Sequence, residues 1–296
     1  MIKKVNYIYF ILFFSTLDFV GAHPTGNLTV FRDHVLWSYV YPIEDEDHHA
    51  CIMIWDKKNE PIPFRISEYE ASDWMMYAGE DYLYLLERRY IGSKNLYQAR
   101  VFKTNLNSQP VEIWPWFDDH WLVGEGGFIM TSDEEMIFCT YPAMYIFEKN
   151  DTPQITTLWE SPIKKIRSLP GDQLLLISDS TTWYLDSEMN VIHSWEDLLM
   201  ELNEAPPLNR NQIFDMDYYN GDLLIAYWGK RSFELISFEN DRNLLLELNP
   251  PFTPHWVAID HDYMYLFAST IEPGQPITPI LLQHHEEKLK LIWKKR

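Results

Sequence analysis

The chain has 296 residues, of which 46% are hydrophobic and 16% aromatic, and its 24 basic and 44 acidic residues give a net charge of −20. So acidic a surface argues against a nucleic-acid partner and against binding to anionic lipid, and it suits cationic, neutral or metal-bearing ligands. The apolar content is enough to bury one large core, so a single domain is expected.

Residues 1–22 have the pattern of a secretory signal peptide. A basic start is followed by an apolar stretch over residues 8–14, and small residues precede a cleavage point expected after Ala22. A membrane anchor is the alternative, but the apolar stretch is short and Asp18 interrupts the segment. We therefore expect an exported protein, periplasmic or extracellular, whose mature part is residues 23–296 and does not insert into a membrane.

Six apolar runs share one feature: an acidic residue stands two positions before each run. These acidic residues are Asp33, Asp81, Glu134, Asp172, Asp222 and Asp262, about 40 to 50 residues apart. An acidic side chain can bond its own backbone in a turn, and a continuous apolar run is typical of a strand buried on both faces. The pattern therefore predicts one turn-and-strand unit repeated six times.

A second series of segments has the same period. After each apolar run the chain has another aromatic-rich strand, a polar turn and a closing strand, as in WYLDSEMNVIHSW over residues 183–195. Four of the closing strands contain a tryptophan near their end, namely Trp114, Trp159, Trp195 and Trp293. A wide ring at the same place in successive units can fill the wedge between packed sheets.

Six units of four short strands each predict an all-β fold, a six-bladed β-propeller of four-stranded antiparallel blades. The expected blades are residues 24–72, 73–120, 121–162, 163–208, 209–254 and 255–296. A β-sandwich or two smaller β-domains is the alternative.

The repeat resembles the quinoprotein-like and WD-type repeats of secreted bacterial β-propeller proteins. The unit from Asp186 to Trp195 is similar to the Asp-to-Trp closing hairpin of quinoprotein repeats, although it lacks their turn glycine, and the first blade has a Trp55-Asp56 pair. This resemblance is at superfamily level and covers the mature chain. It implies the propeller fold and no particular activity.

One segment departs from the repeat. In SWEDLLMELNEAPPLNRNQ, Ser194 and Asp197 have the spacing of a capping box, and apolar residues then recur at helical intervals until Pro206. The spacing predicts a short helical insertion within residues 196–212. The insertion is either a lid packed on the rim or a gate or partner surface.

The two cysteines are expected to stay unpaired. Cys51 falls in the third strand of blade 1 and Cys139 in the second strand of blade 3, so blade 2 separates them. A disulfide needs Cα atoms within about 7 Å, although an exported compartment would permit the bond.

The motifs of common catalytic sites are missing from the sequence. It has no Gly-rich phosphate loop, no HExxH, no cysteine pair at metal spacing and no GxSxG turn. We therefore expect no cofactor and assign no metal site.

The candidate ligand-binding residues come from the propeller geometry. The first residues of the innermost strands of a propeller line the mouth of its central channel. We expect these residues in the segments SDWMM, DDHWL, IKKIR, RNQIFDMD and TPHWV. The resulting candidates are Asp73, Trp74, Asp119, His120, Trp121, Lys164, Arg210, Asn211, Asp215, His255 and Trp256.

Two functions remain open. The first and preferred one is an exported, monomeric binding scaffold that holds a protein, peptide or glycan at the channel mouth or side loops. The alternative is a small metal-dependent hydrolase, lyase or lactonase with its site at the channel mouth, where His120 and His255 stand near carboxylates. An ion held by Asp73, Asp119 or Asp215 would favour the enzyme.

Overall fold

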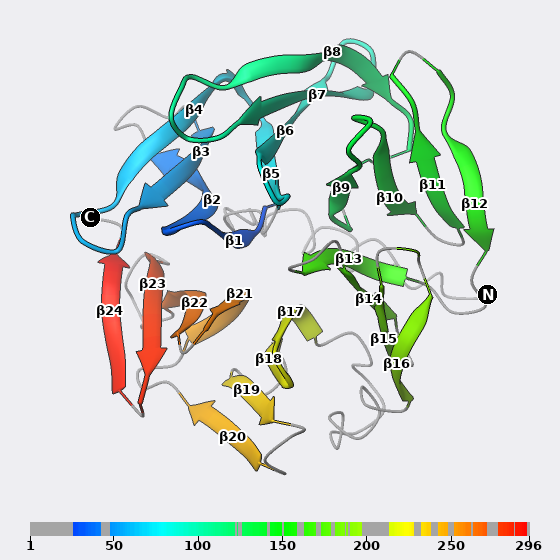
Figure 1. Ribbon diagram of the computed structural model, residues 1–296. Coiled ribbons are helices and arrows are strands. Elements are labelled where there is room, and N and C mark those ends of the chain that lie inside the picture. Colours follow the sequence, from blue (N-terminus) through cyan, green and yellow to red (C-terminus); the bar gives the residue numbers. More distant parts are fainter. Residues whose placement is uncertain are drawn as a thin grey trace, which may run out of the picture.

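Six four-stranded antiparallel sheets stand in a ring around a central axis (Figure 1). The computed structural model describes residues 26–42, 48–121, 123, 126–140, 143–149, 151–158, 163–169, 173–178, 181–186, 188, 190–196, 213–227, 232–237, 242–247, 252–261, 263–270, 278–286 and 288–294. The prediction of a six-bladed β-propeller is confirmed, and the β-sandwich alternative is wrong.

Each blade is made of four strands that follow one another in the chain. Blade 1 comprises β1 Leu28–Phe31, β2 His34–Pro42, β3 His48–Trp55 and β4 Ile62–Glu70. Blade 2 comprises β5 Ser72–Ala78, β6 Leu83–Ile91, β7 Leu96–Thr104 and β8 Val111–Asp119. Blade 3 comprises β9 Phe128–Met130, β10 Met136–Thr140, β11 Ala143–Phe147 and β12 Gln154–Leu158.

The second half of the ring repeats the arrangement. Blade 4 comprises β13 Ile163–Leu169, β14 Gln173–Ser178, β15 Thr181–Leu185 and β16 Val191–Glu196. Blade 5 comprises β17 Ile213–Tyr219, β18 Asp222–Tyr227, β19 Ser232–Ser237 and β20 Arg242–Glu247. Blade 6 comprises β21 Phe252–Asp260, β22 Tyr263–Thr270, β23 Thr278–His285 and β24 Lys288–Lys294.

Burial falls from the second strands of the blades to the outermost strands at the rim. The second strands lie between two neighbouring blades, so β14 and β18 are buried at every residue after the first. The outermost strand β4 has one buried residue in nine. This gradient explains why the second strands are continuous apolar runs, whereas the outer strands mix polar and apolar residues.

The acidic turn residues lie where the repeat predicts them. Asp33, Asp81 and Glu134 stand between the first and second strands of blades 1 to 3, and Asp222 begins β18. Glu134 has a φ of 62°, a left-handed conformation that tight turns often require. Asp172 and Asp262 lie outside the described residues.

Tryptophans of the outermost strands connect blades 2, 4 and 6 to the blades that follow them. Trp114 of β8 lies edge-on to Phe147 of blade 3, with 5.0 Å between ring centroids, and its Nε1 donates to the carbonyl oxygen of Glu134 at 3.2 Å. In the same way, the Trp195 ring lies 5.4 Å from Tyr218 of blade 5. The prediction that these tryptophans occupy equivalent places in their blades is therefore confirmed for Trp114 and Trp195. Trp159 lies outside the described residues.

The same wedge closes the ring between its last and first blades. Trp293 of β24 lies 5.6 Å from Trp37 and 5.2 Å from Tyr39, both on β2, measured between ring centroids. Trp55, on β3, packs with these residues in one buried cluster. Because each sheet is built from consecutive strands, side-chain packing of this kind joins blade 6 to blade 1.

Both cysteines are buried and unpaired, as their blade positions predict. The expected helical insertion falls on residues 197–212, which lie outside the described residues, and Ser194 to Glu196 belong to β16. Within the described part of the chain, the secondary structure consists of strands and turns. No described helix is long and apolar enough to cross a membrane.

One assignment of the sequence analysis is wrong. Residues 118–122 do not open the innermost strand of blade 3, because Asp119 ends β8, the outermost strand of blade 2. The innermost strand of blade 3 is β9, which begins at Phe128. The segment DDHWL resembles a strand by composition, but its first two residues end β8 of blade 2.

We expect the tryptophans that pack between blades to stabilise the folded protein. Trp114→Ala removes a side chain that is 2% exposed and its bond to blade 3, so we expect a loss of about 3 to 5 kcal/mol in the free energy of unfolding. Trp116→Ala on the same strand is the matched control, because Trp116 is only partly buried. Urea unfolding of both variants tests this, and a loss below about 1 kcal/mol for Trp114→Ala would contradict the wedge.

Candidate functional site

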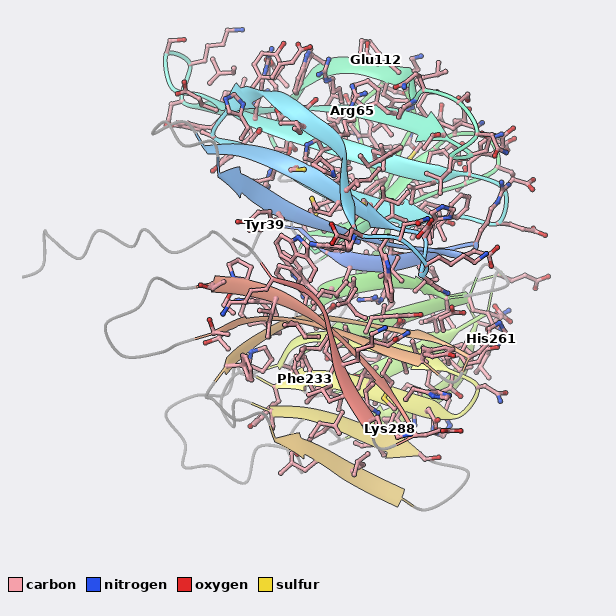
Figure 2. The ribbon with its side chains drawn as sticks, turned by 90° about the vertical axis from the view of Figure 1, so that its left-hand side faces the viewer. Tyr39, Arg65, Glu112, Phe233, His261 and Lys288 are labelled. Carbon is pink, nitrogen blue, oxygen red and sulfur yellow. The ribbon has the colours of Figure 1, made fainter. Side chains whose placement is uncertain are left out.

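Two hollows, each of about 400 Å³, lie along the central axis. The first hollow lies at the beginnings of the innermost strands and is lined by Asp73, Arg88, Lys165, Phe214 and Asp215 among others. The second hollow lies at their ends, and its lining includes Tyr219 and Asp260. Figure 2 views the ring from its side and places Tyr39 and His261 toward opposite faces. His261 bonds Tyr219 at 2.8 Å, so the second hollow belongs to its face.

Arg167 of β13 lies between the two hollows and lines both. Its Nη1 donates to Asp215 Oδ2 at 2.8 Å, and its Nε lies 3.1 Å from Asp217 Oδ1. Its Nη2 donates to the carbonyl oxygens of Leu28 at 2.9 Å and Val257 at 2.6 Å. One guanidinium from blade 4 therefore binds blades 5, 6 and 1.

The two carboxylates that bind Arg167 also connect blade 5 to blade 6. Asp215 Oδ2 accepts the backbone N–H of Val257 at 3.0 Å, and Asp217 Oδ2 accepts that of Ile259 at 2.8 Å. Burial raises the pKa of Asp217 to about 6, although Arg167 favours its charged form.

Lys165 stands two residues before Arg167, so both side chains leave β13 on the same face. Its Nζ lies 3.5 Å from Asp215 Oδ1 and donates to the carbonyl oxygen of Phe214. Burial lowers the pKa of Lys165, and the Arg167 charge acts in the same direction, while Asp215 opposes it.

Asp73 and Arg88 form the opposite wall of the first hollow. Their carboxylate and guanidinium lie 3.3 Å apart, and the Arg88 guanidinium carbon lies 4.8 Å from the centre of the Tyr97 ring. The hollow thus presents three cationic side chains and two carboxylates. This balance is unusual in a chain whose net charge is −20.

Of the eleven candidates, the structure brings Asp73 and Asp215 together in the first hollow. Trp74 and Trp256 are packed in the core at 1% and 4% exposure, where Trp74 donates to the carbonyl oxygen of Ala50 at 3.3 Å and Trp256 stacks on Phe267. These two tryptophans hold blades together and do not line either hollow.

The segment from Asp119 to Trp121 lies away from the hollows. Asp119 Oδ1 accepts the backbone N–H groups of Trp121 at 3.2 Å and Val123 at 3.0 Å, so this carboxylate stabilises the turn after β8. His120 is exposed, and the Trp121 ring packs near Phe147 of blade 3.

His255 is placed between blades 5 and 6, behind the wall of the first hollow. Its ring lies 5.4 Å from the Phe214 ring, its Nε2 lies 2.9 Å from Ser269 Oγ, and its buried Nδ1 has no hydrogen-bond partner among the described residues. Burial and, to a smaller degree, the Lys165 charge lower the pKa of His255 to about 4. The imidazole is therefore neutral at physiological pH.

The sequence analysis missed Lys165, Arg167, Arg88 and Asp217. Lys165 and Arg167 stand in the segment IKKIR from which Lys164 was chosen, and the side chain of Lys164 lies outside the described part, as do Arg210 and Asn211. Strand alternation was the available signal, because positions 165 and 167 share a face and positions 215 and 217 share another.

The described residues contain no group of three or more His, Cys, Asp or Glu side chains arranged to hold a metal ion. Asp215 is instead occupied by Arg167 and Lys165, so the charges of the first hollow compensate one another within the chain.

No protein-family model matches the chain, and no curated protein matches it. Among solved structures, it is similar to virginiamycin B lyase from Staphylococcus aureus, at 9% identity over 82% of this chain and 90% of that one, with a TM-score of 0.48. It is also similar to the Cps50 (Swd1) β-propeller domain of Myceliophteria thermophila, at 10% identity over 84% and 94% of the two chains, with a TM-score of 0.46.

A third similar structure is a nidogen/laminin complex, at 10% identity over 78% of this chain and 82% of that one, with a TM-score of 0.49. At these identities the likeness is one of fold, and it transfers no activity or ligand to this chain.

Arg167→Met tests the bracing role of the guanidinium. The change leaves Asp215 and Asp217 without their arginine, so we expect a loss of about 3 to 5 kcal/mol in the free energy of unfolding. Arg32→Met is the control, because Arg32 also donates to two backbone carbonyls but is exposed, and its loss should stay below about 1 kcal/mol. Equal losses in urea unfolding would contradict the brace.

The pH dependence of stability has two opposing parts. His255 binds its proton less tightly when folded, so its contribution to stability is lost as pH falls from about 6.5 to about 4, by about 3 kcal/mol in all. Asp217 binds its proton more tightly when folded, so its contribution is lost as pH rises through about 6.

Substitution separates these two parts. Between pH 4 and 6.5 the free energy of unfolding should rise less steeply with pH in His255→Gln than in the wild type, and more steeply in Asp217→Asn. Urea unfolding across this range measures the slopes. Slopes that change in the same direction in both variants would show that these pKa assignments are wrong.

Proposed function

We propose that the protein is a binding scaffold that holds a peptide, protein segment or glycan in the first hollow. The observation that supports this is a hollow of about 400 Å³, within the usual size range of ligand pockets, lined by innermost strands of several blades. Rigid strands, unlike loops, hold side chains at fixed positions before a ligand arrives.

The lining suits a ligand with both polar and apolar parts. Apolar side chains such as Met75, Phe128 and Ile213 alternate with the charged groups of Asp73, Arg88 and Lys165. Convergent polar groups on an apolar wall fix the orientation of a ligand as well as its affinity.

The alternative, a metal-dependent hydrolase, lyase or lactonase, has less support than the binding scaffold. The described carboxylates of the hollow are held by arginine or lysine, and His120 and His255 lie apart from them. Elemental analysis of protein purified without chelator addresses this alternative. A stoichiometric divalent ion that is lost in Asp73→Ala would support the enzyme and count against the scaffold, because Asp73 lines the first hollow.

Export to the periplasm or the cell exterior is also part of the proposal. Its support is the signal-peptide pattern of residues 1–22, which lie outside the described part of the chain. N-terminal sequencing of the protein from its native source should start at His23. A start at Met1 would contradict cleavage.

Two matched isoleucine variants test where the ligand binds. Ile213 of β17 lines the first hollow, Ile259 of β21 lines the second, and both are partly buried. In a thermal-shift screen of peptides and oligosaccharides, a ligand should raise the melting temperature of the wild type and of Ile259→Trp. Ile213→Trp should lose the response because the larger ring fills the first hollow.

The same screen can contradict the proposal in two ways. A ligand that stabilises Ile213→Trp as strongly as the wild type would bind elsewhere. An absence of stabilisation by every peptide and oligosaccharide would count against this ligand class. Circular dichroism confirms first that both variants keep the strand content of the wild type.

A further inference from the structure

Lys165 supplies the amine among the charged side chains that line the first hollow. Its side chain is 28% exposed, so a small molecule in the hollow can reach it, while much of its hydration is removed. The other cations of the hollow are the guanidiniums of Arg88 and Arg167. Guanidiniums keep their proton in proteins, so the lysine is the cation that can become a neutral nucleophile.

Two acceptors face the Lys165 amine, the carbonyl oxygen of Phe214 and the carboxylate of Asp215, but Lys165 shares Asp215 with Arg167. Asp215 forms ion pairs with two cations. Its carboxylate lies 2.8 Å from the Arg167 guanidinium and 3.5 Å from the Lys165 amine, so the contact with Arg167 is the shorter. Arg167 has a second carboxylate in Asp217, whereas Lys165 has only Asp215 among its described ion pairs. A partly desolvated ammonium beside a fixed guanidinium favours loss of its own proton, which agrees with the lowered pKa.

Two other lysines have the opposite environment and serve as internal references. Lys57 forms an ion pair with Asp260, and Lys103 lies 2.8 Å from Glu134. Their carboxylate partners raise the pKa of both side chains. These opposite directions favour the neutral amine at Lys165 over that at Lys57 and Lys103.

We propose that Lys165 is a nucleophilic amine that binds small carbonyl compounds in the first hollow as a reversible imine. The lone pair of Nζ attacks the carbonyl carbon and forms the C–N bond as the C=O π bond breaks, the nitrogen gives up one proton, and the former carbonyl oxygen takes up one. The carbinolamine then loses water to give the imine, and hydrolysis reverses both steps. Asp215, 3.5 Å from Nζ, is placed to exchange the protons.

The lining also indicates which carbonyl compounds fit. The guanidiniums of Arg88 and Arg167 stay protonated when Lys165 is neutral, and they can pair with a carboxylate on the ligand, so an aldehyde or keto group that carries a carboxylate is favoured over a neutral one. This inference uses the first hollow and extends the proposed binding function, but its test requires no knowledge of the natural ligand.

Borohydride trapping tests the imine. The full mature protein is incubated with glyoxylate or, as a neutral aldehyde, propionaldehyde, then reduced, and the modified lysines are identified by peptide mass spectrometry. We expect reduction of a glyoxylate adduct at Lys165 and a lower yield with propionaldehyde. Lys165→Arg should abolish this adduct, whereas Lys57→Arg should leave it unchanged.

Competitive labelling measures the amine without a carbonyl ligand. With an amine-selective acylating reagent at pH 7, Lys165 should react at least roughly tenfold faster than Lys57 and Lys103, because the neutral amine is the reactive form. Equal labelling rates, or adducts distributed evenly over surface lysines, would overturn the proposal. Equal trapping of the two aldehydes at Lys165 would overturn its carboxylate part.

These outcomes are independent of the scaffold proposal. A peptide or glycan that stabilises Lys165→Arg as it stabilises the wild type, together with equal labelling rates, would retain the scaffold and reject the reactive amine. Faster labelling of Lys165, with no ligand found in the thermal-shift screen, would retain the amine and reject that ligand class.

Discussion

The structure depends on the bonds that Arg167 makes across the axis of the ring. In a propeller of separate sheets, each blade touches its neighbours, and nothing in the strand pairing ties one side of the ring to the other. Arg167 supplies that tie, because its guanidinium bonds residues of blades 5, 6 and 1 while its backbone belongs to blade 4. The two hollows exist on either side of this side chain.

Charge and hydrophobic packing have separate places in this molecule. Tryptophans and other large rings fill the wedges between blades toward the rim, where a wide side chain fits a gap that broadens outward. Near the axis the gap is narrow, and charged side chains on alternate positions of β13 and β17 meet there instead. The polar centre is therefore a consequence of ring geometry, and it leaves the first hollow with ionisable groups in fixed positions.

The repeat could be predicted from sequence because each blade repeats the same physical problem. A turn residue such as Asp33 and a wedge residue such as Trp114 recur at one period, and that period specifies the number of blades. The site was harder to predict, because it depends on which side of a strand each residue faces. The sequence analysis missed Lys165, which lines the first hollow, because it did not establish which alternate positions of this strand face the axis.

Sequence separation adds a consequence for folding order. Within each blade the strands pair with their neighbours in the chain, so these contacts form early and locally. Arg167, in contrast, bonds Leu28 across 139 residues and Val257 across 90. Both bonds together require blades 1, 4 and 6 to meet at the axis, so the pair of bonds distinguishes a closed ring from an open row of blades.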